Sequence, residues 1–285
     1  MESGKTLPDQ AKPFIRWGGY VLLAAALVYC GLALRDLGSA AVVEQLSNGA
    51  WVATLGLGLA YGAALVCLAV GWIALCAPRG TLSISETVAI YGPAVIAKYI
   101  PGSIFQYGSR QLNGAEFGLG QKAMAKASLA EAAIHIPAAL LCAGVLWLGG
   151  GFVGLGALGL AGLAAGAIAA RGIVRAAGLQ IAFFAAFAAL MMAIASLATS
   201  ASDPAQLTAM FMLAWVAGFL VPVAPGGIGV RESALLALAV PAEQTALVLA
   251  FALLTRLATT LGDLAIGLGG YGLLLSSRWN RQASA

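Results

Sequence analysis

Residues 50–76 read AWVATLGLGLAYGAALVCLAVGWIALC, and no charged side chain interrupts them. An α-helix needs about 20 apolar residues to cross the hydrocarbon core of a bilayer, so this stretch alone predicts a transmembrane helix. Four further stretches satisfy the same criterion: 17–34, 127–148, 152–170 and 178–198. A sixth stretch, 245–275, is also long but contains Arg256 and Asp263. The chain is therefore predicted to be an all-α polytopic membrane protein.

The overall composition agrees with this class. Of the 285 residues, 61% are hydrophobic and 9% are charged, whereas a soluble domain carries about a quarter charged residues. The 37 glycines favour close packing of helices in lipid. The net charge of +4 does not indicate a nucleic-acid partner, because few basic residues cluster away from the ends of the apolar stretches.

Two regions, 84–113 and 206–240, are apolar helical patterns that Pro-Gly sequences interrupt near the middle. The first contains KYIPGS (98–103) and the second contains PVAPGGIGVRE (222–232). Proline removes a backbone donor and glycine adopts conformations closed to other residues, so a helix is expected to stop at each break. The arms on either side are mostly about 10–16 residues long, which is too short to span a bilayer.

The distribution of charge favours a hairpin at each of these regions. If both regions return to the side they entered from, and the N-terminus is cytoplasmic, the cytoplasmic side receives ten basic residues: Lys5, Lys12, Arg16, Arg79, Lys122, Lys126, Arg171, Arg175, Arg278 and Arg281. Only Arg35 then lies outside, with Asp36, Glu44, Asp203 and Glu243. A single crossing by 84–113 would move four of the ten to the other side, against the positive-inside rule.

This topology predicts about six spanning helices and two oppositely oriented re-entrant hairpins whose tips approach each other near the midplane. Such a pair of interrupted segments points to an inverted repeat with a substrate site between the tips. We expect a cytoplasmic lead at 1–16, one transmembrane domain at 17–276 and a cytoplasmic tail at 277–285. No stretch remains for a separate catalytic domain, so an enzyme is not expected.

Four basic residues are left over after the flanks are assigned: Lys98, Arg110, Arg231 and Arg256. A basic residue at the centre of a membrane helix costs about 2.5–3.5 kcal/mol, so it is expected to face a partner or a wet cavity. One interpretation is pairing with an acidic residue, for which the candidates are Glu86, Glu116, Glu131, Glu232 and Asp263. The other interpretation is a site for an anionic group. Arg110 and Arg231 are the strongest candidates for that site, because each follows closely after a Pro-Gly break.

The breaks themselves add to the second interpretation. A half-helix that restarts after a break presents unpaired N–H groups and the positive end of its dipole, which together bind phosphate or carboxylate. The alternative is a plain kink or a tight surface loop. The candidate residues of the two breaks are Gly102, Ser103, Gly226, Gly227, Gly229 and Glu232.

Three further ionisable residues are candidates for a proton relay. Glu131 and His135 are four residues apart and share a helix face, where they could relay protons or form a hydrogen-bonded pair of structural use. Asp263 shares a face with Arg256 seven residues earlier, about 10 Å away along the axis, so each is expected to find partners on other helices. One histidine and dispersed acids predict neither a metal site nor a cofactor.

The pairing of AKYIPGSIFQYGSRQL (97–112) with PVAPGGIGVRE (222–232), followed by Arg256, resembles the lysylphosphatidylglycerol synthase/flippase transmembrane family of bacterial inner-membrane proteins. Full-length members flip aminoacylated phospholipid and carry a soluble aminoacyl-transfer domain, for which the present sequence offers no counterpart. The resemblance implies lipid handling in the bacterial inner membrane. It assigns functional positions to the matched residues, which are Lys98, Pro101, Gly102, Arg110, Pro225, Gly226, Gly227, Gly229, Glu232 and Arg256.

The residues and the resemblance together predict a lipid translocase whose substrate is an anionic phospholipid, an isoprenoid-phosphate lipid or a glycolipid. The alternative is a partner that docks on a lipid-modifying enzyme and regulates it without transporting anything. The glycine-rich helices also offer a surface for a homo-oligomer.

Overall fold

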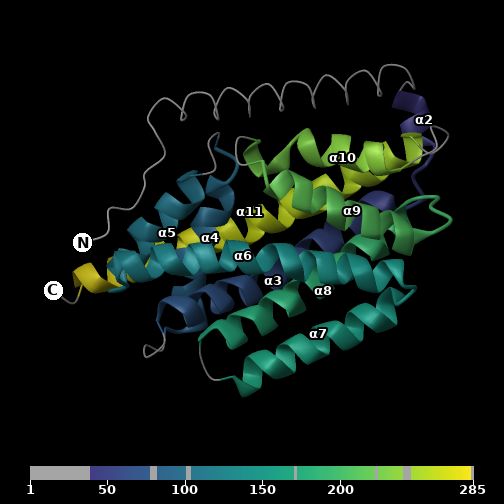
Figure 1. The fold of residues 1–285 in the computed structure, drawn as a ribbon. Helices are drawn as coiled ribbons and strands as arrows, with labels where there is room; N and C mark the ends of the chain where they lie inside the picture. The colour runs from purple at the N-terminus through teal and green to yellow at the C-terminus, as the bar shows by residue number, and fades with distance from the viewer. Residues whose placement is uncertain are drawn as a thin grey trace, which may run out of the picture.

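The computed structural model describes residues 39–77, 82–100, 104–169, 172–221, 224–239 and 245–283. Within these ranges the regular elements are all helices (Figure 1). They are α2 (Ser39–Val43), α3 (Ala50–Cys76), α4 (Ile84–Ala97), α5 (Ile104–Glu116), α6 (Gln121–Trp147), α7 (Gly151–Ile168), α8 (Gly172–Ala198), α9 (Pro204–Phe219), the 3₁₀ turn η1 (Pro225–Gly227), α10 (Val230–Leu238) and α11 (Thr245–Ala283). The expected span at 17–34 and the site residues Gly102 and Ser103 lie outside the described residues.

Five of these helices, α3, α6, α7, α8 and α11, are long and apolar enough to cross a membrane. Many large apolar side chains on their outer faces are exposed, among them Val52, Leu129 and Val153. Such a surface is suited to lipid and would be a liability in water. The prediction of a multi-pass helical membrane protein is confirmed at this level.

The observed helices extend beyond the predicted apolar stretches. α6 begins at Gln121 rather than at residue 127, and α8 begins at Gly172 rather than at residue 178. The added turns carry Lys122, Lys126 and Arg175. Polar residues with adequate helix propensity continue a helix past its apolar segment, so hydropathy alone placed both starts too late.

Four shorter helices form two adjacent pairs, α4 with α5 and α9 with α10. Their lengths are 14, 13, 16 and 9 residues, each below the roughly 20 residues of a spanning helix. Figure 1 shows the first pair toward the end of the molecule that carries the C-terminus and the second pair toward the end near α2. Local sequence defines the starts of α4 and α9, because Ser83 and Glu86 form a capping box on α4 and Asp203 accepts a hydrogen bond from Gln206 N at 2.9 Å on α9.

Glycines bring α4 into backbone contact with α11. A Cβ atom added to Gly92 would lie 2.5 Å from the carbonyl oxygen of Ile266 and 3.1 Å from Cα of Gly270. Helices packed without the intervening side chains gain many van der Waals contacts, which is the principal source of helix association in lipid. This contact fixes the position of α4, whose C-terminal end reaches the site described next.

Candidate functional site

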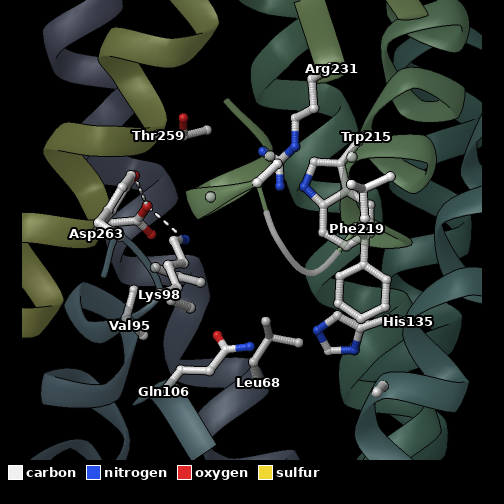
Figure 2. Close-up of a pocket in the computed structure, with 18 of the residues that line it drawn as sticks. Leu68, Val95, Lys98, Gln106, His135, Trp215, Phe219, Arg231, Thr259 and Asp263 are labelled. Carbon is white, nitrogen blue, oxygen red and sulfur yellow. Dashed lines mark hydrogen bonds and ion pairs between the residues drawn. The ribbon is translucent and has the colours of Figure 1, made fainter. Parts of the chain in front are cut away.

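A cavity of about 340 Å³ lies inside the bundle, between the end of α4, α5, the end of α9, η1 and α10. The interrupted segments of both short-helix pairs therefore border one hollow. Figure 2 shows side chains from these segments converging on it. Eight of the sequence-predicted site residues line it: Lys98, Arg110, His135, Gly226, Gly227, Arg231, Arg256 and Asp263.

Arg110, on α5, forms a buried ion pair with Glu131 on α6. Only 6% of Arg110 and 3% of Glu131 is exposed. The hydroxyl of Tyr91 donates to the second carboxylate oxygen of Glu131 at 2.7 Å, and the guanidinium lies 4.0 Å from the centre of the Tyr91 ring. A buried pair with these additional contacts is strongly destabilised by the loss of either partner, so Glu131 holds Arg110 in place.

The sequence left open a proton relay or a hydrogen-bonded pair between Glu131 and His135, and in the structure the contact between them runs from the His135 ring to the Glu131 backbone rather than to its carboxylate. The Glu131 carboxylate points to Arg110 and Tyr91 instead, because a cation satisfies a buried carboxylate better than a neutral ring does. Nδ1 of His135 lies 2.8 Å from the backbone oxygen of Glu131 and 2.7 Å from Oε1 of Gln180. The two residues are neighbours, but their side chains belong to different contacts.

Lys98, at the C-terminal end of α4, pairs with Asp263 on α11, with Nζ 2.7 Å from Oδ2. Asp263 is 1% exposed and also accepts from the hydroxyls of Tyr99 at 2.6 Å and Tyr61 at 3.3 Å. Three donors, two from the end of α4 and one from α3, thus satisfy one buried carboxylate. As expected from the sequence, the partners of Asp263 lie away from its own helix.

The third pair joins α10 to α11. Arg256 donates from Nε and Nη2 to Oε1 of Glu232 at 3.1 and 2.6 Å, and from Nη1 to the backbone oxygen of Gly226 at 2.9 Å. Oε2 of Glu232 accepts from the backbone N–H of Gly229 at 2.8 Å, at the start of α10. The intervening turn needs glycine, since Gly226, Gly227 and Gly229 have φ of 58°, 72° and 80°. Glu232 and Arg256 therefore fix the shape of this turn.

Arg231 differs from the other three cations. Among the described residues no carboxylate lies within ion-pair distance of it. Its buried Nε has no hydrogen-bond partner there, which is also true of Nε of Arg110. The side chain runs through a slot between Gly218 and Gly227, where added Cβ atoms would lie 2.4 Å from its Cγ and 2.7 Å from its Nε. Its guanidinium carbon lies 5.3 Å from the centre of the Trp215 ring.

Aromatic rings form the wall beside Arg231. Trp215 stacks on Phe219 with ring centres 5.3 Å apart, and Phe219 stacks on His135 at 5.6 Å. In Figure 2 the indole nitrogen of Trp215 lies on the side of the ring that faces the Arg231 guanidinium. No described residue accepts a hydrogen bond from this indole N–H. Two donors, one of them charged, therefore lie together at the cavity.

Sequence reasoning missed the aromatic and amide members of the site, which are Tyr61, Tyr91, Tyr99, Gln180, Trp215 and Phe219. The four-residue spacing of Trp215 and Phe219 on one helix is a signal that could have indicated a shared face. The tyrosines carried no such signal, because their hydroxyls meet carboxylates from residues 40 to 202 positions away.

The guanidinium of Arg231 and the indole N–H of Trp215 are suited to binding an anion in the cavity. The described residues contain no cluster of histidine, cysteine or acidic side chains that could hold a metal ion.

Comparison with protein-family models, with curated proteins and with solved structures finds no match to this chain. The family suggested by the two motifs and Arg256 accordingly stays a prediction.

Proposed function

We propose that this protein is a membrane lipid translocase that binds the anionic headgroup of a phospholipid, an isoprenoid-phosphate lipid or a glycolipid in the central cavity. The observation that carries the proposal is a cavity inside a helical membrane domain that contains Arg231 without a carboxylate partner among the described residues. A cation is costly in such surroundings, and an anionic ligand would compensate it. The acyl or prenyl tails would remain in the bilayer.

The proposed topology has six spans, including 17–34, and places α4–α5 and α9–α10 as re-entrant hairpins that enter from opposite sides. The lengths of the four helices support it. A contact between the two segments supports it as well, because a Cβ atom at Gly226 would lie 3.1 Å from Cε1 of Tyr99. The positive-inside rule supports cytoplasmic termini. The resemblance to the lysylphosphatidylglycerol synthase/flippase family implies the bacterial inner membrane.

An inverted repeat is supported by the position of two ion pairs. In each half, the returning helix of the short pair bonds to the long helix that follows it: Arg110 of α5 to Glu131 of α6, and Glu232 of α10 to Arg256 of α11. The separations along the chain are similar, at 21 and 24 residues. Rocking of two such halves about the cavity would expose the headgroup to each side in turn.

The test is transport by the purified full-length protein in proteoliposomes that contain fluorescent short-chain lipids of several headgroup classes. We expect translocation of an anionic lipid above that of protein-free vesicles, and its loss in Arg231→Gln. Arg281→Gln is the matched control, because the Arg281 side chain is 45% exposed and binds Glu116, and neither residue lines the cavity. Absence of transport across the whole panel, polyprenyl phosphates included, would refute the translocase.

The second candidate is a partner or regulator of a lipid-modifying enzyme. The observation that favours it is the outer face of α7, the least buried of the five long helices, which exposes Val153, Leu160 and Ile168. A regulator would retain its complex and its effect on the enzyme in Arg231→Gln, whereas a translocase would lose transport in that variant.

A further inference from the structure

We infer that the cavity selects a headgroup with a single negative charge, a phosphodiester, and that Arg231 and Trp215 are the residues that determine this selection. The inference rests on the proposed function and names its substrate class. Phosphomonoester and diphosphate lipids, which carry more charge, are excluded by it.

The charges of the cavity give the first reason. Four cations meet there, and three of them each pair with a different carboxylate: Lys98 with Asp263, Arg110 with Glu131, and Arg256 with Glu232. Within the described part of the chain, one positive charge, that of Arg231, is left without a partner. A ligand with one negative charge makes the cavity neutral, while a second negative charge would stay uncompensated in surroundings of low dielectric.

A dianion could obtain a second cation only by displacing a carboxylate from one of the three pairs. Two of the three pairs resist this. Arg110 and Glu131 are both more than nine-tenths buried, so separating them leaves a buried charge without its partner. Glu232 also accepts from the N-terminal backbone of α10 and holds the turn through Arg256, so its release would cost local structure as well.

The geometry around Arg231 gives the second reason. The slot between Gly218 and Gly227 restricts the side chain, and the ring of Trp215 lies against the guanidinium. A guanidinium beside an indole N–H offers a compact set of donors to the two non-bridging oxygens of a phosphodiester. Figure 2 shows both groups on the same side of the cavity, away from the Lys98–Asp263 pair.

The cavity volume agrees with a compact headgroup. Its 340 Å³ lies at the lower end of the roughly 300–1,000 Å³ of ligand pockets in proteins. A glycerophosphodiester is small enough for such a space, and a phosphodiester of this kind bears one charge at neutral pH.

The experiment measures equilibrium binding of defined lipids to the full-length protein in neutral detergent by native mass spectrometry. The probes are phosphatidylglycerol, phosphatidic acid at about pH 8.5, where a phosphomonoester carries nearly two charges, phosphatidylcholine, and water-soluble glycerophosphoglycerol. We expect phosphatidylglycerol to bind at least tenfold more tightly than phosphatidic acid. The soluble diester should bind at least tenfold more weakly than the lipid, and equal binding would overturn a lipid as the source of the phosphodiester.

Variants test the residues assigned to the selection. Arg231→Gln is expected to weaken phosphatidylglycerol binding about 10- to 100-fold, the usual effect of losing a hydrogen bond to a charged group. Arg231→Lys should restore part of it, and Trp215→Phe, which keeps the ring but removes the N–H, should weaken binding about three- to tenfold. Arg281→Gln should bind as the wild type does.

Glu131→Gln is expected to reverse the lipid preference, because it leaves Arg110 as a second cation without a carboxylate partner. We expect this variant to bind phosphatidic acid more tightly than phosphatidylglycerol. If it does not fold, the wild-type preference and the Arg231 variants decide the question. Equal or tighter binding of phosphatidic acid by the wild type would overturn the inference.

The outcomes separate this inference from the proposed function. Selective binding of the phosphodiester without transport would refute the translocase and leave the charge selection standing. Transport that is indifferent to headgroup charge would support the translocase and overturn the selection.

Discussion

The contact between α4 and α11 provides the most quantitative test of the packing. A Cβ atom at Gly270 would lie 2.5 Å from the backbone oxygen of Val88 and 3.0 Å from Cα of Gly92, whereas ordinary contacts begin at 3.4 Å. Gly270→Ala therefore requires the two backbones to separate by about 0.9 Å (3.4 minus 2.5). Overpacking of this kind costs about 1–3 kcal/mol. The adjacent Gly269 has no atom within 4 Å of an added Cβ, which makes Gly269→Ala a matched control.

Thermal unfolding in detergent measures the effect, with an expected fall in Tm of roughly 3–10 °C for Gly270→Ala and none for Gly269→Ala. Because Lys98 lies at the end of α4, a displaced α4 should also lengthen the 2.7 Å contact between Lys98 and Asp263. Binding of the anionic lipid should then change in Gly270→Ala alone. Equal Tm values for the two variants would refute the backbone contact and with it the placement of α4.

Three further predictions concern the acidic residues. Glu131→Gln leaves Arg110 buried without its carboxylate and should destabilise the fold by about 3–5 kcal/mol, measured by chemical unfolding; a change below 1 kcal/mol would contradict the pair. Glu232→Gln should loosen the turn before α10 and raise hydrogen exchange at Gly229 N–H, with unchanged exchange as the contrary result. At the exposed end of α5, hydrogen bonds from Arg278 lower the pKa of Glu116 below its ordinary value. Ionised Glu116 thus stabilises the folded state above the unfolded-state pKa, and this contribution is lost as pH falls through the lower folded-state pKa; Glu116→Gln should flatten that part of a Tm–pH curve.

The helical membrane class followed directly from hydropathy, since an uninterrupted run such as 50–76 has no stable alternative to a spanning helix. The stops near 98–103 and 222–232 were also predictable, because proline and glycine act through local backbone chemistry. The beginnings of α6 and α8 were not, because polar flanking turns carry no hydropathy signal. The closeness of α4 to α11 depends on which glycines face each other, which one sequence does not reveal.

The candidate site, like the fold, was predictable from the sequence only in part. The four basic residues that stood out in apolar sequence all line one cavity, and their role in binding a ligand stays a prediction. Their partners could not be assigned, because pairs such as Lys98 with Asp263 join residues 165 positions apart and depend on tertiary packing. The sequence also treated Arg231 and Arg110 alike, as each follows a break, whereas among the described residues a carboxylate pairs with Arg110 and none with Arg231.

The three ion pairs have a common mechanical role that explains why they occur where they do. Each joins an interrupted segment to an uninterrupted helix: the end of α4 to α11, α5 to α6, and α10 to α11. Irregular backbone lacks the continuous hydrogen bonding that makes a long helix rigid, so a charged contact fixes each segment to a rigid neighbour. Successive residues on a helix project about 100° apart. Glu232 can therefore contact α11 while Arg231, the residue before it, faces the cavity, and one turn of α10 supplies both the support and the cation that has no carboxylate partner among the described residues.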